Sequence, residues 1–462
     1  MDFILSIFGW IQDLGANVMM PIIIAIIGIC MGAGVGKSIR AGLTVGVGFI
    51  GLNLVLGIFG GYVAPAAETM IANWGLSTSI MDVGWPAAAA IAMGSAVGTF
   101  IIPICLLVNI VMLITNTTQT VNIDIWNYWH FAFTGSLVYM LTGNIVYGII
   151  AAIVNMIIIM VMGDVTAPLL EKANGMEGIS LPHGFTTAYT PIAFAINWII
   201  DKIPGVNKID LNLDEVQEKF GVVGEPIVIG TVLGAVIGAL AGYGIGPTAA
   251  TETYAGDPGI LGLAVQLGAV LVLIPKMAAL FMEGLLPISD AATEFIQKRF
   301  TARGKMYIGL DSAIGIGNPT TLAVSLILIP IALLLAVILP GNEVLPLVDL
   351  SVIPYMFVLI IPIVNGNGFR AIIVGIVNLA AGLLIATNLA PAITSSAIAS
   401  GFEVAANTTI SSICDGANPL TWIMVQFNKF GVIGVVLAVV LALALALWNR
   451  NRILKQAAEM HE

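Results

Sequence analysis

The chain is a succession of long apolar runs separated by short stretches rich in glycine, proline and polar residues. Four of the longest runs cover residues 18–34, 42–58, 149–162 and 432–448. They do not alternate polar with apolar side chains, as the strands of a membrane barrel would. A helix crosses a bilayer with about 20 mostly apolar residues, so the pattern predicts an all-α polytopic membrane protein with about 11 transmembrane helices.

Composition supports a polytopic membrane protein and argues against several classes of function. Hydrophobic residues make up 59% of the 462 residues and charged residues only 9%, which is more apolar material than a soluble domain can bury. The net charge of −10 argues against a nucleic-acid partner. No GxxxxGK[ST] loop for ATP occurs, and the three cysteines show neither metal nor disulfide spacing. We therefore expect no metal and no cofactor.

The two halves of the chain echo one another. Five short motifs recur in the same order, separated by 222 to 233 residues. The matched positions are Pro65 with Pro287, Pro86 with Pro319, Pro103 with Pro330, Asp124 with Asp349, and His183 with Asp415. Chance matches between apolar segments are the alternative, but the shared order favours an internal duplication.

Basic residues indicate how the repeats are oriented. The first is Lys37, so no positively charged region of a secretory signal precedes the first apolar run, which we expect to remain as a membrane helix. With five spans per repeat, an outside N-terminus and one further helix leading to a cytoplasmic C-terminus, every Lys and Arg except Lys276 and Lys429 falls on the inner side. An odd number of spans inverts the second repeat, which is typical of alternating-access transporters with a substrate site at the repeat interface.

This topology divides the chain into five parts. They are a first five-helix repeat at 1–163, a cytoplasmic segment at 164–222 with a hairpin at 179–200, a second five-helix repeat at 223–390, a second hairpin at 391–430, and a C-terminal helix with a cytoplasmic tail at 431–462. The loops expected outside are roughly 65–85, 142–144, 244–258, 341–352 and 388–420.

Four stretches interrupt the apolar pattern with glycine, proline and polar side chains. They cover residues 81–90, 179–191, 309–321 and 411–421 and form two repeat-related pairs. Broken backbone at membrane depth is tolerated where protein or a water-filled cavity satisfies it. We interpret the four as re-entrant hairpins or unwound tips that face a shared cavity and hold a polar solute; the alternative is that they are ordinary surface loops.

The interruptions supply most of the candidate substrate ligands. Carboxylates, amides and neutral imidazoles hydrogen-bond hydroxyl groups, whereas an anionic sugar acid favours Arg or Lys, and none lies in the four stretches. A further polar segment at 122–135 places an amide, an imidazole and a hydroxyl on one helix face, although a packed structural histidine is the alternative there. Its two tryptophans, Trp126 and Trp129, are expected at the membrane interface. The candidates are Asp82, Trp85, Asn127, His130, Thr134, His183, Asp311, Asn367 and Asp415.

These same residues carry a family resemblance. The motifs are DVGWP, VNIDIWN.WH, LPHG...AY.PIA, IPGVNKI, KFG..GEP, IGLD, PGN.VLP and P.TW, and they cover nearly the whole chain in order. They resemble the galactitol-type enzyme IIC, the membrane permease subunit of the bacterial phosphoenolpyruvate-dependent sugar phosphotransferase system, in the ascorbate–galactitol group.

The resemblance implies a homodimeric elevator transporter in the inner membrane, in which a scaffold domain fixes the dimer and a core domain carries the substrate across. It implies a galactitol-like polyol that is phosphorylated at the inner face by a separate IIB subunit, whose phosphocysteine is loaded by IIA. By the same resemblance, Trp85, His130, Thr134, His183, Asp311 and Asn367 are substrate contacts, with Asp82, Asn127 and Asp415 as secondary candidates. This chain would then be a translocation subunit without catalytic residues, and IIB would dock on segments 164–222 and 297–305.

Two other readings stay open. An ion-coupled secondary transporter of a polyol or a sugar acid such as ascorbate would use Asp311, Asp82 or His183 as a proton site. An intramembrane enzyme would need paired catalytic groups on facing helices, for which Asp311 and Asp415 are the candidate pair.

Overall fold

The computed structural model confirms a mostly helical chain with several apolar helices. It describes residues 16–58, 61–62, 64–74, 80–124, 126–211, 226–248, 257–270, 305–346, 349–400, 404 and 409–459, together with scattered positions between 272 and 287. Within this part of the chain, four helices are long and apolar enough to cross a membrane. They are α8 (Ile145–Asn174), α13 (Pro319–Ile338), α16 (Gly368–Ala399) and α19 (Val432–Glu459).

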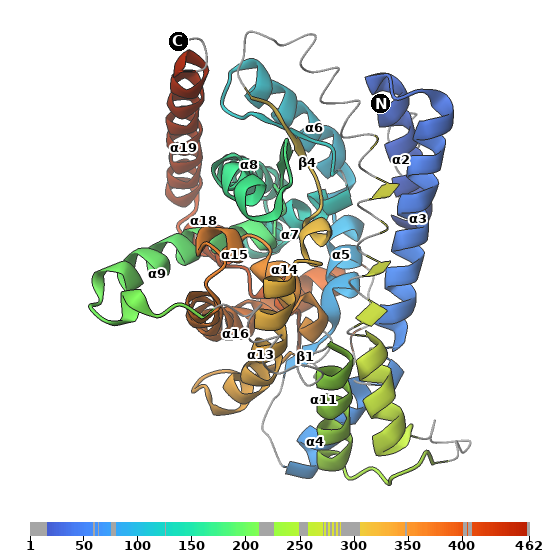
Figure 1. Ribbon diagram of the computed structural model, residues 1–462. Helices are drawn as coiled ribbons and strands as arrows, with labels where there is room; N and C mark the ends of the chain where they lie inside the picture. The colour runs from blue at the N-terminus through green and yellow to red at the C-terminus, as the bar shows by residue number, and fades with distance from the viewer. Residues whose placement is uncertain are drawn as a thin grey trace.

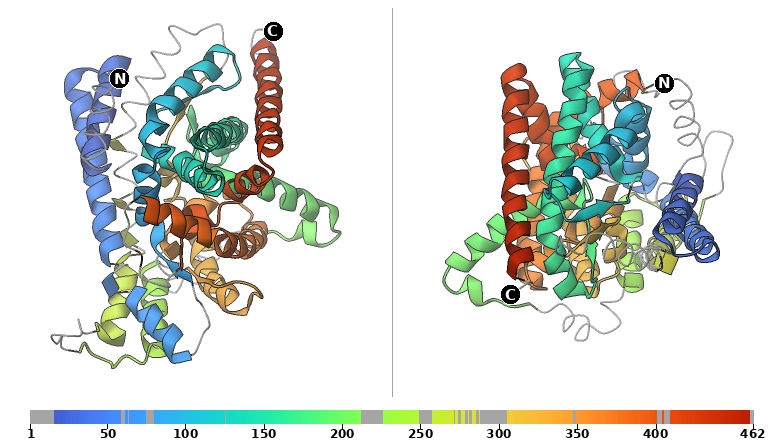
Figure 2. Two further views of the ribbon diagram at one scale, coloured as in Figure 1. Left: turned by 180° about the vertical axis from the view of Figure 1, so that it is seen from behind. Right: turned by 90° about the horizontal axis from the view of Figure 1, so that it is seen from above.

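A helical hairpin forms one side of the molecule. It consists of α2 (Ala16–Met31) and α3 (Val35–Ile58), with α4 (Ala64–Trp74) and α11 (Pro226–Leu240) packed together near its lower end (Figure 1). In both views of Figure 2, α19 lies at the opposite edge of the molecule. Most of the other elements lie between these two edges.

The centre of the molecule is α7 (Trp129–Thr142), which is buried from Trp129 to Val138. It packs against α8 where two glycines, Gly135 and Gly148, face each other. A Cβ atom on Gly135 would lie 2.6 Å from the carbonyl oxygen of Gly148, so only glycine allows the two backbones to approach this closely.

Several shorter helices complete the described part of the fold. They are α5 (Gly84–Gly94), α6 (Gly98–Ile114), α9 (Thr190–Lys202), α14 (Ile353–Phe357), α15 (Ile360–Ile363), α17 (Ile413–Gly416) and α18 (Pro419–Asn428). Of these, α5, α6, α17 and α18 contact α7 directly, as does the long helix α16. Helix α9 projects away from the rest of the molecule (Figure 1).

Within the described ranges, two small parallel sheets interrupt the helical fold. One sheet has the order β5-β1-β6, and the other has the order β2-β4-β3. Their strands are β1 (Ile80–Asp82), β2 (Thr120–Asn122), β3 (Ile179–Ser180), β4 (Tyr307–Gly309), β5 (Val344–Leu345) and β6 (Thr409–Ser411). In Figure 1, β1 lies near the lower end of the molecule and β4 lies toward the upper end.

Each sheet combines strands from both halves of the chain. The central strand β1 belongs to the first half, and its neighbours β5 and β6 belong to the second. The other sheet has the reverse composition, because β4 of the second half lies between β2 and β3 of the first. If β1 corresponds to β4, β5 to β2 and β6 to β3, the two sheets have the same strand order. This agreement supports the predicted duplication.

The strands of each sheet can also be compared with the side of the membrane on which the predicted topology places their loops. The three strands β1, β5 and β6 come from segments expected outside, and the other three come from segments that this topology does not place outside. Two predicted boundaries fall inside helices, since α8 runs past residue 163 and α16 runs past residue 390. Residues 179–200 form β3, a 3-10 turn and most of α9. The other predicted divisions stay predictions.

Trp129, which was expected in an interfacial aromatic belt, has a side chain enclosed by protein. Its side chain is 2% exposed, and its ring lies 3.9 Å, centroid to centroid, from the ring of His130. The residue begins α7 in the protein interior, so its ring packs against protein and is not exposed as the ring of a belt tryptophan would be.

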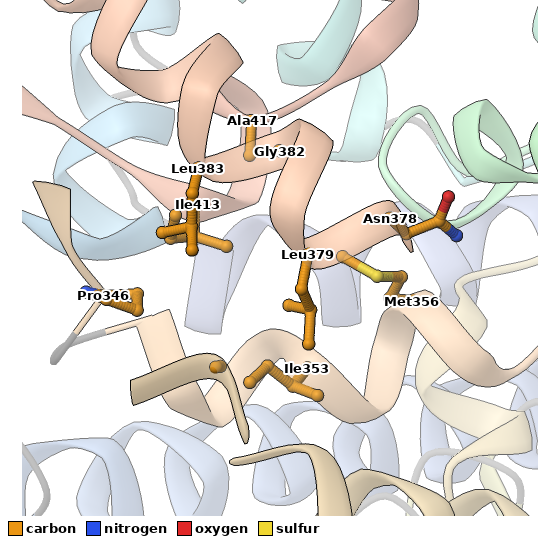
Figure 3. A pocket seen from close by; sticks show the side chains of 10 residues that line it. Pro346, Ile353, Met356, Asn378, Leu379, Gly382, Leu383, Ile413 and Ala417 are labelled. Atoms are coloured by element: carbon orange, nitrogen blue, oxygen red, sulfur yellow. The ribbon is translucent and has the colours of Figure 1, made fainter. Parts of the chain in front are cut away.

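An apolar pocket lies beside α16 and contains one polar side chain, Asn378 (Figure 3). Aliphatic residues such as Ile353, Leu379 and Leu383 line it, and the amide of Asn378 points away from them. Asn378 is 0% exposed, and neither of its side-chain polar atoms has a hydrogen-bond partner among the described residues. A buried amide without a partner lowers stability.

We expect Asn378→Leu to stabilise the protein. Leucine has a similar volume and removes the desolvation cost of the amide, so the free energy of unfolding should rise by about 1–3 kcal/mol. Thermal unfolding of the purified protein in detergent measures this change. An unchanged or lower midpoint would mean that the amide has a partner that stabilises it.

Candidate functional site

The predicted interruptions are buried in the protein. Strands β1, β3, β4 and β6 lead into them, and the side chains of Asp82, His183 and Asp415 are 6%, 4% and 0% exposed. The interruptions continue as 3-10 turns or short helices, of which η3 (Thr186–Tyr189) and η6 (Ser312–Gly315) are examples. The alternative of ordinary surface loops is therefore wrong for these residues.

A chain of acidic and imidazole side chains joins three of the four interruptions to α7. His130 Nδ1 lies 2.7 Å from Asp415 Oδ2, and His130 Nε2 lies 3.3 Å from His183 Nε2. His183 Nε2 is in turn 3.8 Å from Asp311 Oδ1. The side chain of Asp311 is 22% exposed and that of His183 only 5%, so the chain is most accessible at its Asp311 end.

An amide links this chain to a second carboxylate. Asn127 Nδ2 donates to Asp311 Oδ2 and to Asp124 Oδ2, each at 2.7 Å. Asp311 also caps η6, because its Oδ1 accepts the backbone N–H of Ala313 at 2.8 Å. Asp124 was not predicted as a site residue, although its match with Asp349 in the second half of the sequence was a signal for it.

A second pair of carboxylates, Asp82 and Asp349, lies beside the β5-β1-β6 sheet. Asp82 Oδ2 accepts the backbone N–H of Asp349 at 2.8 Å, and Asp349 Oδ1 accepts the backbone N–H of Trp85 at 2.7 Å. Ser412 donates its hydroxyl to Asp349 Oδ2 at 2.5 Å. Asp82 and Trp85 therefore belong to a hydrogen-bonded tip that reaches the α17 segment, where Asp415 lies three residues beyond Ser412.

Thr134 lies one helical turn beyond His130. Its hydroxyl is 2.7 Å from the hydroxyl of Thr421 and accepts the amide N–H of Asn155 at 2.6 Å. Tyr355 is a neighbour that sequence reasoning missed, and its ring stacks 6.4 Å, centroid to centroid, from that of His183.

Asn367 has a different environment. Its Oδ1 caps α16 by accepting the backbone N–H of Arg370, and its Nδ2 donates to the carbonyl oxygen of Ile209. These hydrogen bonds hold the 203–211 loop against the start of α16, and neither of them reaches the histidines.

The assembled site presents hydrogen-bonding groups without a cation. Among the described residues, no Lys or Arg forms an ion pair with Asp82, Asp124, Asp311, Asp349 or Asp415. The described residues also contain no cluster of three or more side chains able to hold a metal ion. Neutral imidazoles, amides and hydroxyls of this kind are suited to the hydroxyl groups of an uncharged solute.

The position of His130 depends on a glycine in the neighbouring interruption. A Cβ atom on Gly184 would overlap with the Cβ of His130. We expect Gly184→Ala to displace the imidazole and to lower the free energy of unfolding by about 1–3 kcal/mol, as overpacking does in other buried sites.

Gly317→Ala is the matched control, because a Cβ atom there meets nothing within 4 Å. Thermal unfolding of both variants in detergent tests this prediction. Equal midpoints for the two variants would show that Gly184 has no special role in holding the ring.

Comparison with known proteins gives the chain a family. Residues 10–407 match the family described as PTS system sugar-specific permease component. A permease IIC component of Escherichia coli K12, named without a substrate, is 39% identical over 449 residues, which cover 97% of this chain and 100% of that protein. Galactitol-specific EIIC components of the phosphotransferase system from E. coli K12 and O157:H7 are each 36% identical over 450 residues, covering 97% of both chains.

The family match includes α7 and three of the four interruptions and ends before β6 and the interruption at 411–421, while the relatives cover 97% of the chain. The chain therefore belongs to the galactitol-type family of sugar-specific permease components of the phosphotransferase system.

Proposed function

We propose that the chain is the IIC subunit that carries a galactitol-like polyol across the bacterial inner membrane. The observation that carries this proposal is the Asp415–His130–His183–Asp311 chain, which brings three of the four interruptions to one buried place. Its groups bind hydroxyls well and offer no cation to an anion. The identity with galactitol-specific relatives supports the choice of polyol.

The chemistry of phosphorylation would lie on other polypeptides. In this proposal a separate IIB subunit, loaded by IIA, transfers the phosphoryl group to the polyol at the inner face, and the IIC chain contributes no catalytic residue. Lys305, which pairs with Glu171 near the cytoplasmic end of α8, belongs to the expected docking area. The rest of the 297–305 docking segment lies outside the described residues.

The movement would be that of an elevator in a homodimer embedded in lipid. The α2–α3 hairpin with α4 and α11 is a candidate scaffold, because these helices lie together at one edge of the molecule (Figure 1). The two sheets and the helices around α7 are the candidate moving core. The N-terminus would lie outside and the C-terminus in the cytoplasm, in agreement with the distribution of basic residues.

Binding of galactitol to the purified protein tests the proposal. We expect galactitol to bind more tightly than other hexitols or ascorbate. Asp311→Asn and His183→Ala should each weaken binding by about 5- to 150-fold, since a lost hydrogen bond in a buried site costs about 1–3 kcal/mol.

Asp210→Asn is the control for Asp311→Asn, because it makes the same replacement of aspartate by asparagine on an exposed loop. Its affinity should equal that of the unchanged protein. Ascorbate binding in place of galactitol, or unaltered galactitol affinity in both site variants, would contradict the assignment of the substrate or of the site.

An ion-coupled transporter is the second candidate, because buried carboxylates next to imidazoles also suit a proton path. The two candidates differ in what they require. Uptake into cells that lack IIA and IIB, abolished by an uncoupler of the proton gradient, would favour ion coupling. Uptake that is lost when IIB is removed, but persists in the presence of the uncoupler, would favour phosphorylation-dependent transport.

A further inference from the structure

The ring of His183 has one consistent protonation pattern. Its Nδ1 lies 3.3 Å from the backbone N–H of Thr186, which donates to it. A ring nitrogen that accepts a hydrogen bond carries no proton, so the proton of the neutral imidazole lies on Nε2. His183 therefore presents a donor toward His130 and Asp311.

The ring of His130 has the opposite pattern. Its Nδ1 faces a carboxylate oxygen of Asp415 at 2.7 Å, and a carboxylate only accepts, so the proton lies on Nδ1. This leaves a lone pair on Nε2, which accepts the Nε2–H of His183 at 3.3 Å. A doubly protonated His130 would direct a second N–H against that donor, so the geometry fits two neutral rings.

Asp415 is itself held in place. Its Oδ1 accepts the amide N–H of Asn418 at 3.0 Å, and the same amide donates to the carbonyl oxygen of Gly184 at 2.9 Å. The orientation of Asn418 is fixed because its Oδ1 caps α18, accepting the backbone N–H groups of Leu420 and Thr421. Each oxygen of Asp415 thus has a donor, and the side chain is 0% exposed.

We propose that Asp415 is a positioning residue that selects the substrate through the tautomer of His130. With the proton on Nδ1, the His130–His183 pair offers one acceptor beside one donor. A single hydroxyl can replace the bond between the rings, donating to His130 Nε2 and accepting from His183 Nε2–H. This inference rests on the proposed transport of a polyol and changes the role expected for Asp415 from substrate contact to support.

The same arrangement disfavours anions. A carboxylate or a fully ionised phosphate group accepts but does not donate, so it would leave His130 Nε2 without a partner and would meet the carboxylate of Asp311. A phosphate group should therefore fit this place less well than a hydroxyl group does.

Ring nitrogen NMR tests the inference directly, because the chain has only three histidines. In protein labelled with nitrogen-15 histidine, the chemical shifts show which ring nitrogen carries the proton. We expect His130 protonated at Nδ1 and His183 at Nε2, with signals assigned by His130→Gln and His183→Gln.

Asp415→Asn should disturb this pattern. The NH2 group of the new asparagine must face either the amide of Asn418, which is also a donor, or Nδ1 of His130. If it faces His130, it donates to Nδ1 and so favours the tautomer with the proton on His130 Nε2. We expect a changed His130 signal and about a 10-fold or greater loss of galactitol affinity. Asp164→Asn is the matched control, since Asp164 is equally buried but bonds to Thr118, Thr120 and Asn449 away from the histidines.

Three outcomes would overturn the inference. They are a His130 proton on Nε2 in the unchanged protein, an Asp415→Asn variant that loses affinity with unaltered tautomers, and an Asp164→Asn variant that shifts the tautomers equally. The first needs no variant and applies even where Asp415→Asn fails to fold. Absence of galactitol binding to the unchanged protein would instead contradict the proposed function, while the NMR result would still decide the role of Asp415.

Discussion

The structure depends on satisfying backbone groups where helices are broken inside an apolar protein. Unpaired peptide groups are costly in hydrocarbon, so each break needs a local partner. Two three-stranded parallel sheets provide it. The central strand β1 pairs with β5 and β6, and β4 pairs with β2 and β3, so each break is completed by strands from the other half of the chain. Neither half can form its breaks alone.

This exchange of strands also determines where the polar side chains lie. Each strand ends just before a polar tip, and three of the four interruptions meet at α7, whose glycine contact with α8 keeps the centre tightly packed. The acids that gather there have no Lys or Arg partner among the described residues. Backbone N–H groups, hydroxyls, amides and imidazoles satisfy them instead, as Asp349 shows with Trp85, Ser412 and Cys414. The result is a polar centre rich in acceptors.

Much of this arrangement was visible in the sequence. Apolar runs gave the helices, and glycine and proline marked the interruptions that hold His183, Asp311 and Asp415. The pairing of strands was not predictable, because segments of two or three residues are too short to show a period of two and their partners lie far away in the chain. Asn418 lies in a predicted interruption but was missed, because its hydrogen bonds to Asp415 and Gly184 depend on the tertiary fold. Asp124 was matched with Asp349 in the sequence but was not predicted as a site residue.

Other differences have their own physical causes. Trp129 packs in the interior, which its position in an aromatic-rich segment did not reveal. Asn367 caps a helix, a role that asparagine often has next to glycine. Local patterns report which residue types are present, whereas the contacts that give each its role depend on the tertiary fold.

A structure of the protein with bound galactitol tests the central claim most directly. The account predicts density for the polyol beside His130 and His183, with one hydroxyl between the two rings and Asp311 within hydrogen-bonding distance of another. Density elsewhere, with the bond between the two histidines intact, would contradict it.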